Sequence, residues 1–460
     1  MKRFLVRTVV LLTACLSLAA DGASQSSVVE ENPLLPLWRD ARWVQDFLNF
    51  DSGITPRLSS EEQAVYQALE KDEALADKPL EKAEQLAAKA GATSSALLSY
   101  VVANLYLRGG DTTNAVRQLE VATSKNDRFL KAHRTLGLLL ARDGKHAEAK
   151  TSLARTVTLG GGDGLIMGML GYCLLNEDNF LSARVAYEQA VLLDSQNVEW
   201  RLGLIKCYVG LSEYASAASL LDELLVQHPD RAALWVLQAN VYVQLEQPQK
   251  AIVNLEVLRR MGEAKPQQLG LLADLYMADG ATELALPIYL AMVDAEGGQD
   301  MRRGIRAVEI LAGRGAWVEA ESLLERVKGV SGSGADDEEA AAVMKLEARV
   351  LGGLGRGGES IALLEEVLEL DPLDGDALLM AGDHYAATEE LEKAEIRFDR
   401  ASKVEGFSAD AWVKQAQLRV RDKRYAEAVE LLRKAQKLRP KTSVQSFLER
   451  VEVAAQRAGG

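Results

Sequence analysis

The stretch GDALLMAGDHYAATEELEKAEIRFDRASKVEGFS, residues 375–408, determines how the rest of the chain is interpreted. Its first half repeats apolar residues at spacings of three, four and seven, which is one face of an α-helix. Its second half repeats that spacing at Ala394, Phe398 and Ala401, after a short polar turn. Because Gly382 and Ala394 have almost no side chain, the two backbones can approach closely. The stretch therefore predicts two helices packed together across a turn.

The same pattern returns every 34 residues over most of the chain. Alanine holds the twentieth position in six consecutive periods, at Ala115, Ala149, Ala183, Ala217, Ala251 and Ala285. The pattern resembles the tetratricopeptide repeat, whose period is 34 residues, and the resemblance covers residues 96–442. It implies an all-α, right-handed superhelical solenoid of helix-turn-helix repeats. It also implies that the first helix of each repeat lines a concave groove.

The register of the repeats divides the chain into seven segments. In chain order they are a signal peptide (1–24), a tether with an aromatic-rich segment (25–58), a degenerate repeat or N-terminal cap (59–95), repeats one to seven (96–334), a linker (335–340), repeats eight to ten (341–442) and a C-terminal capping helix (443–460). The aromatic-rich segment has two interpretations. It either packs on the first repeat or forms an arm that docks another protein.

The N-terminus predicts export. Lys2, Arg3 and Arg7 precede the apolar run Thr8–Ala20, and small residues follow, as in a secretory signal. The run ending at Cys15 also looks like the lipobox of a bacterial lipoprotein, so a cleaved signal and a lipidated Cys15 remain alternatives. No later stretch is long and apolar enough to span a bilayer. We therefore expect a periplasmic or cell-envelope protein, free or anchored as a lipoprotein.

Composition argues against several classes of function. The formal net charge of −14 repels phosphate backbones, so no nucleic-acid partner is expected. None of the four histidines has a ligand partner at metal-site spacing. The glycine-rich stretches 160–164 and 352–358 fall at repeat turns and lack the Gly-Lys-Ser/Thr of a phosphate loop. Neither a metal nor a small-molecule cofactor is expected. Cys173 and Cys207 lie one period apart on neighbouring helices, which predicts free thiols.

The resemblance assigns the second, fifth, ninth, twelfth and thirteenth positions of each first helix to the ligand. The polar and aromatic residues at these positions in the first block are Tyr100, Asn104, Arg108, Arg134, Arg142, Tyr172, Asn176, Lys206 and Asn240. They predict a locally basic, amide-rich strip that suits an acidic or extended peptide, or else a solvated face. Lys345 and Arg349 match the last part of a carboxylate clamp known in some relatives. The preceding repeats lack its asparagines, so the clamp is not carried over.

These observations favour a non-enzymatic, exported scaffold that binds protein or peptide segments in its groove. Repeat proteins of this kind assist envelope complexes such as outer-membrane assembly, pilus or TonB-type systems, as the resemblance implies. One alternative is a lipid-anchored structural lipoprotein of the envelope. Another is an enzyme that processes envelope glycans or peptides, but the converging carboxylates or activated nucleophile that it needs are not evident in the sequence.

Overall fold

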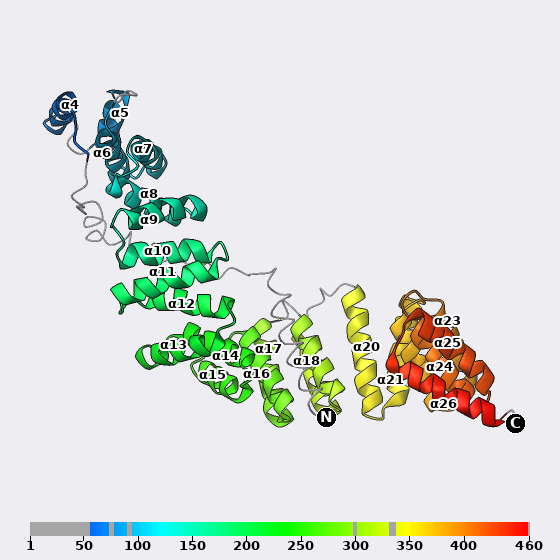
Figure 1. The fold of residues 1–460 in the computed structure, drawn as a ribbon. Coiled ribbons are helices and arrows are strands. Elements are labelled where there is room, and N and C mark those ends of the chain that lie inside the picture. The colour runs from blue at the N-terminus through cyan, green and yellow to red at the C-terminus, as the bar shows by residue number, and fades with distance from the viewer. Residues whose placement is uncertain (1–55, 73–77, 90–93, 298–300, 331–336, 459–460) are drawn as a thin grey trace. The chain divides into compact units, whose positions relative to one another are not determined.

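The computed structural model describes residues 56–72, 78–89, 94–297, 301–330 and 337–458. Every regular element in these ranges is an α-helix (Figure 1). The predicted all-α repeat architecture is confirmed. The predicted signal, the lipobox with Cys15 and the aromatic-rich segment lie outside the described residues. The helices fall into two units divided between Asn254 and Leu255, and each unit is described by itself.

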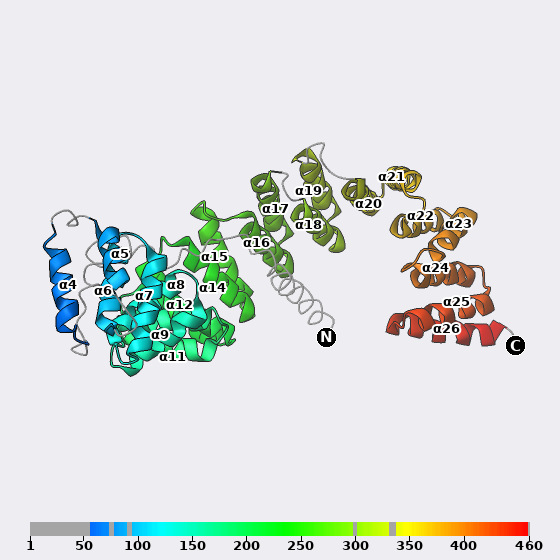
Figure 2. The same ribbon diagram turned by 90° about the horizontal axis from the view of Figure 1, so that it is seen from above.

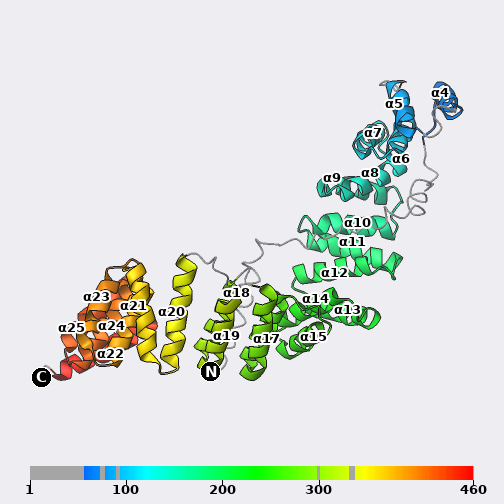
Figure 3. The same cartoon turned by 180° about the vertical axis from the view of Figure 1, so that it is seen from behind.

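The N-terminal unit, whose described residues run from 56 to 254, consists of helix pairs that follow one another along the chain. Its helices are α4 (Ser60–Glu70), α5 (Pro79–Lys89), α6 (Ala96–Arg108), α7 (Thr112–Lys125), α8 (Leu130–Arg142), α9 (His146–Thr158), α10 (Gly164–Leu175), α11 (Phe180–Leu193), α12 (Val198–Gly210), α13 (Tyr214–Gln227), α14 (Ala232–Gln244) and the start of α15 (Pro248–Arg260). From α6 to α14, successive first helices begin 34 residues apart. Figures 1 and 3 show α10, α11 and α12 side by side.

The turn inside each repeat needs one residue with positive φ. Gly110 and Gly144 supply it in the first two repeats, at φ of 81° and 76°. Asp178 and Ser212 hold φ of 55° and 60° at the equivalent places in the next two. A residue with a Cβ costs roughly 1–2 kcal/mol in this region, so packing of the flanking helices must stabilise these two turns.

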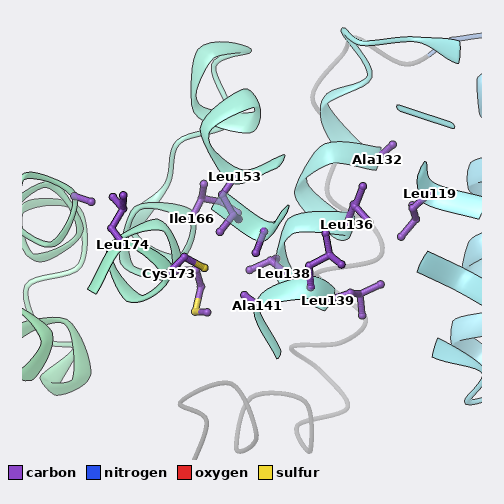
Figure 4. Close-up of a cluster of buried hydrophobic side chains, with 14 of the residues drawn as sticks. Leu119, Ala132, Leu136, Leu138, Leu139, Ala141, Leu153, Ile166, Cys173 and Leu174 are labelled. Carbon is purple, nitrogen blue, oxygen red and sulfur yellow. The ribbon is translucent and has the colours of Figure 1, made fainter. Parts of the chain in front are cut away.

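The core of the N-terminal unit runs without interruption from α6 to α12. The alanines at the twentieth position are fully buried, among them Ala149 and Ala183. Figure 4 shows Leu153 and Ile166 together in this core, with Cys173 nearby. Cys173 and Cys207 are free thiols, as predicted, and both are completely buried.

The C-terminal unit, whose described residues run from 255 to 458, contains the remaining helix pairs. Its helices after α15 are α16 (Pro266–Asp279), α17 (Thr282–Glu296), α18 (Arg302–Gly313), α19 (Trp317–Val330), α20 (Asp337–Gly353), α21 (Gly357–Leu370), α22 (Gly375–Ala387), α23 (Leu391–Ser402), α24 (Ser408–Arg421), α25 (Tyr425–Leu438) and α26 (Thr442–Ala458). Figure 2 shows α21 to α26 following one another in chain order.

The close helix approach predicted for residues 375–408 occurs between α22 and α23. A Cβ added at Gly382 would lie 2.4 Å from a ring carbon of Phe398, whose side chain is only 1% exposed. At the end of the unit, Val444, Leu448 and Val451 of α26 are buried against the core of α24 and α25. The last helix thus covers an apolar face that would otherwise meet water.

One half-buried acid, Asp274, lies where α16 packs on α17. The Asp274 carboxylate in α16 accepts a hydrogen bond of 2.5 Å from the Tyr289 hydroxyl in α17. Burial raises the pKa of the Asp274 carboxyl above its ordinary value. Burial, followed by the nearby Asp274 charge, also raises the pKa of Tyr289.

The described helices include none with the length and hydropathy needed to cross a membrane.

Candidate functional site

The first helices of the repeats form the inner row of the N-terminal unit. In this row α8 contacts α10, and α10 contacts α12. Among these described helices, no contact of similar extent joins α9 to α11 or α11 to α13. From α8 to α12 the first helices are packed more closely than the second, so this part of the stack curves toward the first helices. We call the first helices α6, α8, α10, α12 and α14 the inner row, and its middle part, from α8 to α12, lies on the concave side.

The residues predicted to face a ligand differ in exposure. Those that are exposed are Arg108, Asn176 and Lys206. Those that are half-buried are Asn104, Arg142, Tyr172 and Asn240. Those that are buried are Tyr100 and Arg134, at 6% and 7% exposure. Tyr100 and Arg134 were predicted to face a ligand, but their burial shows that they are not freely accessible groove residues.

Tyr100 is a core residue. Its ring centroid lies 5.0 Å from that of Phe129, which is completely buried at the start of α8. The tilted arrangement of the two rings is a favourable one for aromatic pairs. The tyrosine therefore joins the first repeat to the second. Its replacement would disturb packing, so Tyr100 is not an accessible groove residue.

Arg134 also joins two repeats. Its guanidinium Nη1 lies 2.7 Å from Oδ2 of Asp163, and Oδ1 of that aspartate accepts the Ile166 amide at the start of α10. The arginine thus fixes the carboxylate that caps the next repeat. Lys345 makes the same arrangement in the C-terminal unit, where it pairs at 2.7 Å with Asp374, the cap of α22.

The inner row is less basic than the sequence predicts. Arg134 is neutralised by Asp163, and Arg142 pairs with the adjacent Asp143 at 2.9 Å. An exposed carboxylate, Glu199, lies at the second position of α12. Two of the four predicted cations are therefore already paired within the protein, and a specific preference for acidic ligands does not follow.

Two asparagines of the inner row have different roles. The side-chain carbonyl oxygen of Asn104 is buried and has no hydrogen-bond partner within the described residues. Because this oxygen has almost no accessible surface, an incoming ligand does not reach it in this conformation. The Asn176 amide instead donates to the backbone carbonyl of Tyr172 at 2.9 Å, at the end of α10.

Half-buried apolar side chains separate the polar groups along the inner row. They occupy ligand-facing positions of α6, α10, α12 and α14 and include Leu97, Leu165, Leu175, Leu202, Val209 and Val236. The prediction named only polar and aromatic residues at these positions. The 34-residue register assigns these apolar residues to the same face, so the signal was present in the sequence. Together the two sets make an amphipathic groove surface.

A histidine borders this surface beside Tyr172. The His146 ring lies 5.3 Å from the Tyr172 ring in an edge-to-face arrangement. Burial lowers the pKa of His146, and the Glu177 carboxylate opposes that shift. The Glu177 carboxylate also pairs with Lys150. Within the described ranges, no group of three His, Cys, Asp or Glu side chains is arranged to hold a metal ion.

Comparison with known families agrees with the repeat geometry. Two family models, each described as tetratricopeptide repeat, match residues 174–241 in one case and residues 100–163, 345–402 and 397–442 in the other. Together they cover half of the 460 residues. The chain belongs to the tetratricopeptide repeat family. Because members of this family bind protein or peptide partners, the chain is a protein-binding repeat scaffold.

One curated relative and several solved structures are similar to this tetratricopeptide repeat protein. The relative is the tetratricopeptide repeat-containing protein trd-1 of Caenorhabditis elegans, 30% identical over 138 residues, which are 28% of this chain and 17% of the relative. The crystal structure of YrrB, a TPR protein with an unusual peptide-binding site, has 19% identity and a TM-score of 0.37, covering 45% of this chain and 97% of YrrB. MamA from Desulfovibrio magneticus RS-1 has 17% identity and a TM-score of 0.35, covering 38% of this chain and 98% of MamA.

A third solved structure covers more of this tetratricopeptide repeat protein. The structure of Naa15/Naa10 bound to HypK-THB has 15% identity and a TM-score of 0.41, covering 85% of this chain and 66% of that one.

Proposed function

We propose that the protein is a non-enzymatic scaffold that binds an extended segment of another protein along the inner row of its N-terminal unit. The observation that carries the proposal is the alternation of half-buried apolar residues with amides on this face, illustrated by Leu165, Leu202 and Asn240. An extended segment presents side chains and backbone amides in alternation. Apolar positions bury its side chains, while asparagines donate to and accept from its backbone.

We further propose that the protein works in the cell envelope and assists the assembly or operation of an envelope complex. The basic start Lys2–Arg7, followed by the apolar run to Ala20, supports export. The alternative is a lipid-anchored structural lipoprotein attached through Cys15. Mass spectrometry of the mature N-terminus separates these outcomes. A diacylated Cys15 supports the anchored form, a start after Ala20 supports the free form, and an intact Met1 overturns export.

An affinity pull-down from native envelope tests the groove. The variant replaces Asn176, Lys206 and Asn240 together by alanine, because none of these side chains is buried. Surface substitutions of this kind change stability by about 0.5 kcal/mol or less each. Loss of interface anchors can cost roughly 2 kcal/mol or more of binding free energy. We expect normal helicity by circular dichroism and loss of the captured partner.

A matched control places three alanines on the second helices. Gln189, Ser219 and Glu223 are exposed on α11 and α13. Their combined replacement should leave capture unchanged. If the groove variant and this control retain the partner equally, the ligand does not bind along the inner row.

A further inference from the structure

A second concave feature lies in the C-terminal unit, between α19, α20 and α21. It is a cavity of about 340 Å³. Its apolar part is formed by Leu324 of α19 with Val350 and Leu351 of α20, all buried. This volume is at the low end for small-molecule pockets, which span about 300–1,000 Å³, and suits one long side chain or two short ones.

Charged side chains from these helices and from the turn before α21 surround this apolar floor. They are Glu321, Glu325, Glu347, Glu359, Lys328 and Arg356. Four carboxylates and two cations leave a net formal charge of −2 at the mouth of the cavity.

The two cations hold three of the carboxylates. The Arg356 guanidinium donates two hydrogen bonds to Glu359, at 2.7 and 2.5 Å, and another to Glu321. Lys328 pairs with Glu347 at 2.6 Å. Glu325 is exposed, and no ion pair to it is found among the described residues. The rim thus holds fixed carboxylate oxygens with negative charge in excess.

A bulky contact also joins α19 to α20. Trp317 at the start of α19 packs directly on the backbone of α20 at Gly353, where an added Cβ would lie 2.2 Å from the indole. The aromatic ring therefore occupies space between the start of α19 and the end of α20. Figure 2 shows these helices in sequence along the unit.

We propose that this cavity binds a lysine or arginine side chain from a segment of a partner protein. The methylene stem of such a side chain lies on the apolar floor, and its cationic end meets the glutamate rim. Long basic side chains combine these two properties, because they bury an apolar stem while the charge stays near solvent. Hydrogen bonds between a cation and a carboxylate are among the stronger ones in proteins. The site shares no residue with the inner row and is proposed independently of it.

Fluorescence anisotropy of the full chain with a labelled peptide tests the proposal. The probe is the hexapeptide Gly-Leu-Arg-Leu-Lys-Gly carrying fluorescein, and the reference peptide has glutamate in place of both basic residues. The first variant carries Glu325→Gln and Glu347→Gln. The second, Ala362→Phe, fills the cavity from an exposed lining position without a change in charge. We expect saturable binding of the basic probe and at least tenfold weaker binding by both variants.

A charge-matched control separates local contact from the general attraction of an acidic protein. Glu366→Gln with Glu369→Gln removes two exposed charges of α21 that do not line the cavity. This control should bind the basic probe as the unmodified chain does. Circular dichroism of every variant verifies that the helices are intact.

Three results would overturn the proposal. The first is no saturable binding of the basic probe. The second is equal weakening in the control, which would reduce the effect to overall charge. The third is that free spermidine binds and the peptide does not, with spermidine binding weakened by the two cavity variants. The site would then bind a small amine and not a protein segment.

Discussion

Replacing Gly382 by alanine tests the helix approach that defines the repeat. The added Cβ would lie 2.4 Å from Phe398, and the ring cannot move away easily because it is only 1% exposed. Overpacking of a core typically costs about 1–3 kcal/mol. Alanine favours a helix over glycine by about 1 kcal/mol, which offsets part of that cost. We expect a net loss of up to roughly 2 kcal/mol.

Urea denaturation followed by circular dichroism measures the change in the free energy of unfolding. Hydrogen exchange should place the loss in α22 and α23, because repeats open locally. Gly352→Ala is the matched control, since Gly352 is exposed in α20 and its added Cβ would lie 3.7 Å from the nearest side-chain atom, Oγ of Ser360. This control should be neutral or stabilising by up to about 1 kcal/mol.

A double substitution gives the decisive comparison. Phe398→Leu removes the ring atoms that an alanine at position 382 would meet. The two changes together should therefore cost less than the sum of their separate costs, by about 0.5–3 kcal/mol. Additive costs, or a Gly382→Ala variant as stable as Gly352→Ala, would refute the close-approach argument.

Four further predictions follow from buried groups and from the last helix. Arg134→Ala should destabilise the protein by about 1–3 kcal/mol in urea titrations, because it removes the buried partner of the half-exposed Asp163 carboxylate. An unchanged free energy of unfolding would show that this ion pair does not hold the two repeats together. Burial raises the pKa of Asp274, so the charged carboxylate destabilises the fold and stability falls as pH rises above about 3.9. The Asp274→Asn variant should therefore gain in free energy of unfolding over the unmodified protein from pH 4 to 7. A difference between the two proteins that does not change with pH would contradict this. Burial raises the pKa of Cys173 and Cys207 to about 12, so peptide mapping should find both unlabelled by iodoacetamide at pH 8 until the protein is denatured. Deleting residues 443–460 should cause self-association in sedimentation analysis, and an unchanged monomer with unchanged melting would exclude the capping role.

The sequence was sufficient for the fold because the repeat depends on local pattern. The period alone identifies Ala149 and Ala183 as equivalent positions of successive repeats, and both are fully buried. The close approach of the two helices was predicted from the small size of Gly382 and Ala394. In each case, a given position of the repeat has the same packing environment in every period.

The site was less predictable because its side chains depend on neighbouring repeats. The register places Arg134 at a ligand-facing position, but its side chain forms an ion pair with Asp163 of the next repeat. Tyr100 is buried because its ring packs on the ring of Phe129, an aromatic residue that the repeat pattern does not require. The cavity beside Glu325 is lined by side chains of α19, α20 and α21 together, and no single period specifies that combination.

The way the helices contact one another has a consequence for how the chain acquires its structure. Each substantial helix–helix contact of the described residues joins helices no more than two apart in chain order. Such low contact order favours rapid folding, because few long loops must close. A repeat can therefore be completed as soon as its successor has emerged, whether from the ribosome or from a translocation pore. Folding can proceed in the direction of synthesis without waiting for the C-terminus.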